Sequence, residues 1–334
     1  MAQRQSAGWQ KRGRAIRHLI TGVAGFIGSQ LADALLAAGD EVAGVDDFYL
    51  GTPRHIACAR SHGGFRFVEA DISDPGGAIA AFRALSEAAG PPDILWHLAA
   101  NSDIAAGAQD PSIDFIRTLG TTYAALQAAA AIGARAVAFA SSSAVYGERD
   151  QLLTEDSGPL LPISNYGAAK LASEALLSAA AETALDRVWI FRFPNVVGPR
   201  TTHGALHDFA GRLAGRPASL TVLGDGSQMK PYVHVAELIQ AMRFITTNAT
   251  ARRNLFNIGP EGPPTRVSFM AEAMIDRFAP GTPIAYAGGD RGWVGDVPRF
   301  AYSAERLAKL GWKPRLSSDE AVLRAAAELA AERA

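Results

Sequence analysis

The sequence predicts an α/β fold in which a doubly wound parallel sheet is followed by a smaller mixed C-terminal domain. From residue 19 to about residue 193, short apolar runs alternate with alanine-rich stretches of helical periodicity. This alternation is typical of a parallel sheet covered by helices on both faces. Beyond residue 194, glycine and proline become frequent and the alternation ends, which indicates a second region of shorter elements.

The individual elements follow from the period of the apolar residues. The expected strands are residues 19–21, 41–45, 66–70, 94–99, 136–140 and 188–193. The expected helices are residues 26–38, 78–89, 112–132 and 165–184, with two more at 304–311 and 317–333. We expect a disordered basic arm over residues 1–17 and a sheet domain over 18–194, to which 228–258 return a strand and a helix. A second domain is expected mainly from 195–334.

The composition is that of an ordinary globular chain. Of the 334 residues, 48% are apolar, and a net charge of −1 gives no electrostatic case for binding nucleic acid. No apolar run approaches the roughly 20 residues that span a membrane. The single Cys58 excludes an internal disulfide and fits a reducing, cytoplasmic setting. We interpret the basic N-terminus as a solvated arm, with a transit peptide or a nucleic-acid contact as alternatives.

A glycine-rich turn links the first expected strand to the first helix. Gly22, Gly25 and Gly28 recur at every third position, and Phe26 and Ile27 begin the helical pattern. Glycines let the backbone approach a pyrophosphate, and a helix N-terminus presents free N–H groups and a positive dipole end to it. The turn therefore predicts a Rossmann-type dinucleotide site, although its spacing differs from Gly-x-Gly-x-x-Gly.

Two acidic residues end the second expected strand. Asp46 and Asp47 follow the apolar run 41–45. A carboxylate at this strand end can accept hydrogen bonds from the adenosine ribose, and it repels a 2′-phosphate. Because no arginine follows directly, we expect NAD and not NADP.

Tyr166 and Lys170 stand four residues apart in an expected helix. That spacing places both side chains on one face, one turn apart. An ammonium beside a phenol stabilises the phenolate, so the pKa of the tyrosine is expected to fall from about 10. Such a tyrosine can take a proton from an alcohol, which is half of an alcohol oxidation; the dinucleotide would accept the hydride.

With these elements the chain resembles the extended short-chain dehydrogenase/reductase family. Within it, the chain is most similar to the NAD-dependent nucleotide-sugar epimerase/dehydratase group, in particular the UDP-glucose (UDP-galactose) 4-epimerases. The resemblance covers roughly residues 17–316. Its motifs are Gly22-x-x-Gly25-Phe-Ile-Gly28, Asp71-Ile72, Leu98-Ala99-Ala100, Ser141-Ser-Ser-Ala-Val-Tyr-Gly147, Tyr166-x-x-x-Lys170, Arg192-Phe193-x-Asn195, Gly224-Asp-Gly-x-Gln228-x-Lys230 and Gly295-Asp-Val-Pro298.

The resemblance implies a role for particular residues. Tyr166 would be the catalytic base, Lys170 would lower its pKa and bind the nicotinamide ribose, and Ser142 would hydrogen-bond the reacting sugar oxygen. NAD would be contacted by Gly22, Gly25, Phe26, Ile27, Gly28, Asp46, Asp47, Asp71, Ile72, Leu98, Ala99, Ala100, Tyr166, Lys170 and Phe193. The substrate would be contacted by Ser142, Asn195, Lys230, Arg291 and Phe300, and no metal is implied.

Three positions depart from the family pattern. Thr118 stands where an asparagine is common, and Lys230 replaces an arginine that binds the diphosphate, which keeps the charge but loses bidentate geometry. Trp293 occupies the place of a second phosphate-binding arginine, for which Arg291 is a substitute. These departures leave the nucleotide open.

The resemblance also orders the possible reactions. A 4,6-dehydratase of this family has an Asp-Glu pair after the catalytic hydroxyl, whereas this chain has Ser143-Ala144. Elimination therefore lacks its acid and base, and a 4-epimerase that retains NAD is expected. A dehydrogenase or reductase that releases its cofactor, another epimerase of the family, and a non-catalytic dinucleotide sensor are the alternatives. A homodimer built on the helices 112–132 and 165–184 is expected by the same resemblance.

Overall fold

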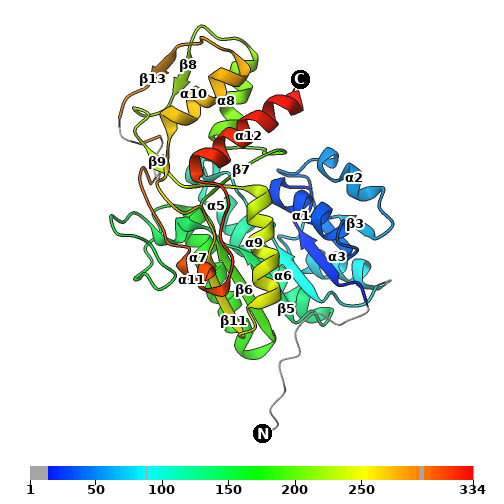
Figure 1. Cartoon of the computed structure of the whole chain (residues 1–334). Coiled ribbons are helices and arrows are strands. Elements are labelled where there is room, and N and C mark those ends of the chain that lie inside the picture. The colour runs from blue at the N-terminus through cyan, green and yellow to red at the C-terminus, as the bar shows by residue number, and fades with distance from the viewer. Residues whose placement is uncertain (1–13, 88, 290, 293–296, 334) are drawn as a thin grey trace.

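The computed structural model describes residues 14–87, 89–289, 291–292 and 297–333. Its centre is a seven-stranded sheet in the order β11-β6-β5-β4-β1-β2-β3, and every pairing in it is parallel (Figure 1). The strands are β1 (Arg17–Thr21), β2 (Glu41–Asp46), β3 (Phe65–Glu69), β4 (Ile94–His97), β5 (Ala136–Ala140), β6 (Arg187–Arg192) and β11 (Arg253–Asn257). The predicted α/β fold is confirmed.

Helices cover both faces of this sheet because successive strand residues point to opposite sides. Ile20 packs with α1 (Phe26–Leu36) and α9 (Val235–Asn248) on one face. Its neighbour Leu19 packs on the other face with α3 (Pro75–Glu87), α6 (Thr121–Ala131) and α7 (Asn165–Thr183). The sheet is thus buried on both sides, and only the ends of its strands can form a site.

The segment expected as one helix over residues 112–132 is broken into three pieces. Asp110 caps the short helix α5 (Pro111–Asp114), a π-helical segment η2 (Phe115–Gly120) follows, and α6 completes the run. The Thr121 hydroxyl donates to the carbonyl of Ile116, five residues back, which suits the wider π turn. Such irregular turns commonly lie at functional sites.

A second group of elements packs above the sheet domain (Figure 1). Its core joins α8 (Ala205–Ala214), α10 (Val267–Phe278) and α12 (Ser318–Arg333). Its strands form two-stranded sheets: β7 (Asn195–Val197) with β10 (Tyr232–His234), β8 (Leu220–Val222) with β13 (Ile284–Tyr286), and β9 (Met229–Lys230) with β12 (Thr265–Arg266). The remaining elements are η1 (Pro53–Ile56), α2 (Ala57–Arg60), α4 (Ile104–Gln109), η3 (Ser143–Tyr146) and α11 (Glu305–Leu310).

Two expected boundaries move. Arg17 belongs to β1 and not to an arm, and Arg14 pairs with Asp93 at 2.5 Å; residues 1–13 lie outside the described residues. The strand expected to reach residue 99 ends at His97, because the backbone N–H groups of Leu98 and Ala99 turn to donate to the Thr21 hydroxyl. Within the described ranges, no helix is long and apolar enough to cross a membrane.

Candidate active site

One large cavity opens at the carboxyl ends of the strands and continues into the second group of elements. Its volume is about 740 Å³, and its lining includes every residue expected to bind the cofactor. Ser142, Asn195, Lys230 and Phe300, all expected to contact the substrate, line the same cavity. Parallel sheets commonly bind ligands at this edge, and here residues from both halves of the chain meet there.

The glycine turn is fitted to a close-lying phosphate. Gly22 has a φ of +72°, and a Cβ built on Gly28 would lie 2.1 Å from the Gly22 carbonyl oxygen. Gly25 caps α1 without a side-chain hydrogen bond, so the first N–H groups of the helix have no side-chain acceptor there. This arrangement suits the pyrophosphate of a dinucleotide.

Asp46 ends β2 at the adenosine end of the cavity and is 8% exposed. Its carboxylate accepts hydrogen bonds from the backbone N–H groups of Ala24 at 2.9 Å and Phe48 at 2.8 Å. Burial raises the pKa of Asp46, against these two hydrogen bonds and with a smaller contribution from Asp47. The same carboxylate therefore fixes the loop geometry and faces the expected ribose.

Arg117, from η2, also lines this end of the cavity and was not expected from the sequence. Its guanidinium pairs with Asp47 at 2.7 Å, lies 3.8 Å from Asp71 and stacks 3.8 Å above the ring of Tyr49. An arginine is therefore present beside Asp47, although none follows this residue directly in sequence. Its two carboxylate partners offset its charge, which leaves the preference for NAD intact.

The catalytic candidates lie at the start of α7, where Ser164 caps the helix and its hydroxyl accepts from the Gly167 N–H at 3.1 Å. Lys170 is 2% exposed, and its ammonium donates to the carbonyl of Ala140 at 2.8 Å. The Lys170 nitrogen lies 5.7 Å from the centre of the Tyr166 ring. Ser142 follows β5 and caps η3, so three expected catalytic side chains meet in one cavity.

The pKa of Tyr166 differs from the expectation. Burial raises the pKa of Tyr166 to about 12; a hydrogen bond with Ser142 opposes the rise, and the charge of Asp114 adds to it. Burial also lowers the pKa of Lys170 to about 7, against the charges of Asp114 and Glu174. The spacing predicted that Lys170 would lower the pKa of Tyr166. Burial has the largest effect because the phenol is removed from water, and the Lys170 ammonium, 5.7 Å from the ring centre, does not reverse the rise.

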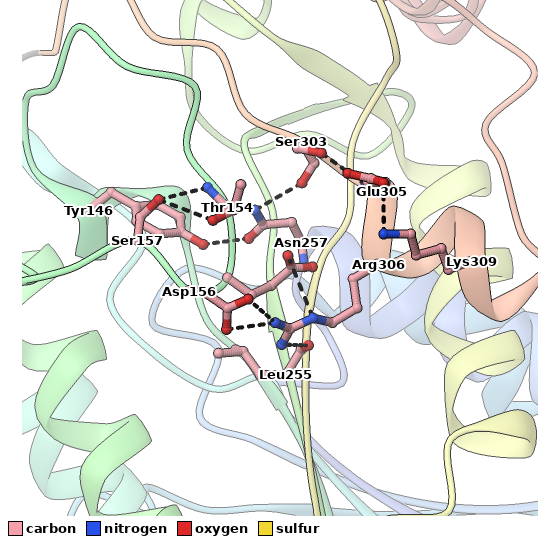
Figure 2. Close-up of polar contacts among 11 residues, drawn as sticks. Tyr146, Thr154, Asp156, Ser157, Leu255, Asn257, Ser303, Glu305, Arg306 and Lys309 are labelled. Carbon is pink, nitrogen blue, oxygen red and sulfur yellow. Dashed lines mark hydrogen bonds and ion pairs between the residues drawn. The ribbon is translucent and has the colours of Figure 1, made fainter.

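A polar network begins at the tyrosine of the Val-Tyr-Gly motif (Figure 2). The Tyr146 hydroxyl donates to the Asn257 side chain at 2.7 Å, and Asn257 in turn donates to the carbonyl of Ser303 at 3.0 Å. Arg306 pairs with Asp156 at 2.7 Å in the same region (Figure 2). These contacts connect η3 and the loop after it with the end of β11 and the start of α11, and Gly147, next to Tyr146, lines the cavity.

Comparison with known proteins agrees with this geometry. A family profile described as "NAD dependent epimerase/dehydratase family" matches residues 18–259. The chain belongs to this family. The UDP-glucose 4-epimerase of Mycolicibacterium smegmatis is 33% identical over 319 residues, covering 92% of this chain and 96% of that protein. A crystal structure of a UDP-galactose 4-epimerase superposes with a TM-score of 0.82 at 31% identity, covering 95% of this chain and 99% of that one.

A relative that catalyses a different reaction has a similar sequence identity to this chain. The dTDP-glucose 4,6-dehydratase of Streptomyces griseus is 32% identical over 249 residues, covering 72% of each chain. A Thermus thermophilus UDP-glucose 4-epimerase solved in complex with NAD has a TM-score of 0.82 at 27% identity, covering 94% of this chain and 99% of that one. The enzyme is therefore NAD-dependent and belongs to the nucleotide-sugar 4-epimerase family. Its relatives in that family differ in substrate and in reaction.

The substrate end of the cavity differs from the expectation at Arg291. This residue does not line the cavity; it is exposed, and its guanidinium lies 2.9 Å from both carboxylate oxygens of Glu148. Its acidic partner Glu148 lies outside the motif that predicted a substrate contact. Trp293, which stands in place of the second phosphate arginine, lies outside the described residues.

Gln228 is a cavity residue to which the sequence analysis assigned no role. It is 2% exposed and lines the cavity, and within the described part of the chain neither oxygen nor nitrogen of its side-chain amide has a hydrogen-bond partner. A buried amide without partners is costly, so its oxygen and nitrogen are available to a ligand. Its place two residues before Lys230 in the Gly224–Lys230 motif was the signal that could have found it. The described residues contain no cluster of three His, Cys, Asp or Glu suited to a metal ion.

Proposed function

We propose that this enzyme is a nucleotide-sugar 4-epimerase of the UDP-glucose/UDP-galactose type. It would oxidise the sugar C4 hydroxyl with tightly held NAD and return the hydride to the opposite face. The observation that carries the proposal is the meeting of Ser142, Tyr166 and Lys170 with the glycine turn in one cavity. Ser143 and Ala144, directly after Ser142, carry no carboxylate with which to eliminate water.

We assign each proton transfer of the proposed reaction to a residue of this chain. Bound NAD supplies the hydride acceptor and donor, and its cationic ring favours a phenolate nearby. Tyr166 takes the proton from the C4 hydroxyl during oxidation. It gives the proton back after the keto sugar has rotated to present its opposite face. Ser142 donates a hydrogen bond to the same oxygen. Lys170 contributes positive charge, which opposes the effect of burial on Tyr166.

The proposed substrate contacts lie at the other end of the cavity. Lys230 would contact the diphosphate as a point charge, and Asn195 would hydrogen-bond it. Phe300, which packs against Tyr302 with ring centres 6.3 Å apart, would limit the space beside the sugar C2. Removal of the charge in Lys230→Ala should raise the KM for the nucleotide sugar and reduce its salt dependence.

A homodimer is part of the proposal. Phe115, Ile116 and Tyr123 are 68%, 48% and 49% exposed, and they belong to η2 and α6, which pack against α7. Large apolar side chains gathered on adjoining elements favour burial against a second copy of this face. Sedimentation of wild type against a Phe115→Asp, Ile116→Asp double variant tests it: the variant should be monomeric.

The central experiment incubates the purified protein with UDP-, GDP-, dTDP- and CDP-sugars without added NAD and identifies the products. We expect UDP-glucose and UDP-galactose to interconvert with no net change in NADH. A dehydrated or decarboxylated product would contradict the proposal. A requirement for added NAD with stoichiometric NADH would favour the alternative, a dehydrogenase that releases its cofactor.

A further inference from the structure

A buried ion pair beside the catalytic helix has no role in the mechanism above. Glu174 on α7 is 6% exposed, and Arg192 at the end of β6 is 3% exposed. The Arg192 guanidinium donates to both carboxylate oxygens of Glu174, at 2.9 and 2.6 Å. Neither residue lines the cavity, so any effect of the pair on catalysis passes through other residues.

Stability alone is a weak reason to bury this pair. Taking two charges out of water costs about as much as their attraction returns, and well-packed apolar residues often replace a buried pair without loss of stability. The pair also leaves Nη1 of Arg192 buried without a hydrogen-bond partner in the part of the chain that the structure describes. A buried pair can instead fix the relative placement of the elements that carry it.

Glu174 lies on the side of α7 that carries the catalytic pair. Tyr166, Lys170 and Glu174 follow one another at intervals of four residues, so their side chains lie along one side of the helix. The Lys170 ammonium donates to the carbonyl of Ala140, the last residue of β5. Glu174 accepts a hydrogen bond at 2.5 Å from the hydroxyl of the next residue, Ser141. The helix is thus attached to the two residues that directly precede the expected catalytic serine.

The neighbouring strand holds the same segment through its main chain. The backbone N–H of Ser141 donates to the carbonyl of Phe191 at 2.8 Å, and that of Ser143 donates to the carbonyl of Phe193 at 3.0 Å. Arg192 lies between these two acceptors in sequence, and its guanidinium reaches α7. The segment is therefore fastened by its backbone to β6 and by one side chain to α7.

The Arg192 guanidinium also meets the Val-Tyr-Gly turn. Its central carbon lies 4.8 Å from the centre of the Tyr146 ring. Tyr146 is the last residue of η3, the short helix that Ser142 caps. The ion pair is thus in contact with each of the segments that bear an expected catalytic side chain: α7 through Glu174, and the start and end of the serine turn through Ser141 and Tyr146.

Another buried acid of this region is bonded differently. Asp114, at the end of α5, is 1% exposed and accepts a hydrogen bond at 2.9 Å from the side chain of Asn101, in the loop after β4. The same amide donates to the carbonyl of Asp103 in that loop. Glu174 is therefore the buried acid whose printed contacts join the catalytic helix to the ends of β5 and β6.

We propose that Ser141, Glu174 and Arg192 form a clamp of positioning residues that sets the alignment of Ser142 with Tyr166. The inference rests on the proposed catalytic roles of these last two residues. Loosening the clamp lets α7, which carries the phenol, shift against the turn that carries the serine hydroxyl. A misplacement of about 1 Å can lower a rate by about 100-fold. Because the clamp does not line the cavity, the loss falls on kcat and not on KM.

The first test removes one hydroxyl from the clamp and one from a neighbouring residue outside it. Ser141→Ala takes away the hydrogen bond to Glu174. The control, Ser173→Ala, takes away a hydroxyl that is buried as deeply but donates to the Ala169 carbonyl within α7. We expect kcat of Ser141→Ala on UDP-galactose to fall roughly 10- to 100-fold, with KM and bound NAD near the wild-type values. The control should keep the wild-type kcat.

The second test separates alignment from stability. Glu174→Leu combined with Arg192→Met replaces the ion pair by apolar side chains, a change that often leaves stability unaltered. We expect thermal unfolding near the wild-type temperature but a kcat reduced at least as far as in Ser141→Ala. Adding Ser141→Ala to this double variant should cause no further loss, because the acceptor of the hydroxyl is already gone. A stable double variant with the wild-type kcat would overturn the inference.

A third measurement does not depend on turnover. Fluorotyrosine incorporated at the seven tyrosines reports the surroundings of each phenol by fluorine NMR, and the signal lost in Tyr166→Phe is that of Tyr166. This signal should shift in Ser141→Ala and stay in place in Ser173→Ala. An unmoved signal, or equal losses of kcat in the two serine variants, means that the clamp is only structural, and the inference is wrong.

The outcomes also separate this inference from the proposed function. A wild type inactive on all nucleotide sugars refutes the proposed function, while the Tyr166 signal still decides whether the clamp positions the phenol. If the double variant at Glu174 and Arg192 does not fold, the comparison of Ser141→Ala with Ser173→Ala decides alone.

Discussion

The cofactor end of the cavity is formed mainly by backbone at the edge of a seven-stranded sheet, whereas the substrate end is formed by side chains on short strands and helices. At the cofactor end, Gly22 and Gly28 approach so closely that no other residue fits, and Asp46 is held by two backbone N–H groups. At the substrate end, the side-chain amide of Gln228 has no hydrogen-bond partner among the described residues. The backbone of the cofactor end is closely packed, whereas the substrate end holds a buried amide without a hydrogen-bond partner in the described chain.

This difference explains how one family carries several reactions on one scaffold. The backbone geometry that binds a pyrophosphate tolerates little change, because an added Cβ would overlap main-chain atoms. Side chains that contact a sugar nucleotide can be exchanged without moving the sheet. The comparison predicts severe losses from changes at the cofactor end and at the catalytic pair, and graded changes in selectivity or KM at the substrate end.

The largest effect is expected at the junction of the two ends. Tyr166→Phe keeps the ring but removes the proton acceptor, so kcat should fall by roughly 10²–10⁴-fold. Bound NAD, measured by its absorbance after denaturation, should stay near the wild-type amount. A variant that turns over at the wild-type rate would end the assignment of Tyr166 as base.

The contrast can be tested by one substitution made at both ends. In Gly28→Ala the new Cβ would meet the Gly22 carbonyl, so we expect a loss of about 1–3 kcal/mol in the free energy of unfolding and little bound NAD. Gly211→Ala, in α8, meets no atom within 4 Å and replaces a helical glycine. It should stabilise by about 1 kcal/mol. Equal effects in thermal unfolding would show that the glycine turn is not constrained as described.

The same contrast separates the features that local sequence patterns predict from those that depend on tertiary packing. The glycine turn and the Tyr166–Lys170 pair are local patterns, so their spacing predicts strand, turn, helix and a shared face. Asp114 is different: an acid in the first turn of a helix is favourable anywhere, and nothing in Pro-Ser-Ile-Asp indicates burial. Arg117 and Arg291 meet their acidic partners through tertiary packing, from segments 70 and 143 residues away.

Burial also explains the wrong expectation for the pKa of Tyr166. Helical spacing places Lys170 near the phenol, but it says nothing of how much water reaches either group. In the folded chain, desolvation raises the pKa of Tyr166 and lowers the pKa of Lys170, and both shifts disfavour the pair of phenolate and ammonium. At neutral pH Tyr166 carries its proton in the absence of added positive charge, so activity should rise with pH until Lys170 loses its own proton.

A selectivity change is the next effect in size. Phe300 fills space at the substrate end, and overlap with an acetamido group would cost on the order of 1–3 kcal/mol. UDP-glucose and UDP-galactose should therefore be preferred over their N-acetyl counterparts by roughly 10–100-fold in kcat/KM. Phe300→Ser should narrow the gap with little change in bound NAD. Equal kcat/KM for both sugar classes in the wild type would remove Phe300 from the sugar site.

Asp46 tests the cofactor end through a side chain. Asp46→Ala removes the carboxylate that we expect to bind the ribose of NAD and also frees the Ala24 and Phe48 N–H groups. We expect NAD to bind roughly tenfold more weakly, since about 1.4 kcal/mol corresponds to that factor, and NADP to be discriminated against less. Calorimetry with both dinucleotides measures this; a wild type that prefers NADP would contradict the interpretation of the strand end.

The smallest effect isolates the unpaired amide of the substrate end. Gln228→Leu keeps the approximate volume and removes two buried polar atoms that have no hydrogen-bond partner among the residues described, so the free energy of unfolding without substrate should rise by about 1 kcal/mol. The same change deprives a bound nucleotide sugar of its hydrogen bonds. We expect KM to rise by roughly 2–10-fold, the equivalent of about 0.5–1.5 kcal/mol, with bound NAD unchanged. Stability and substrate affinity would then move in opposite directions at this position, unlike at Gly28, where both are lost. Thermal unfolding and KM measured on one preparation decide it: a less stable Gln228→Leu protein with unchanged KM would mean that the amide is part of the packing and not of the substrate site.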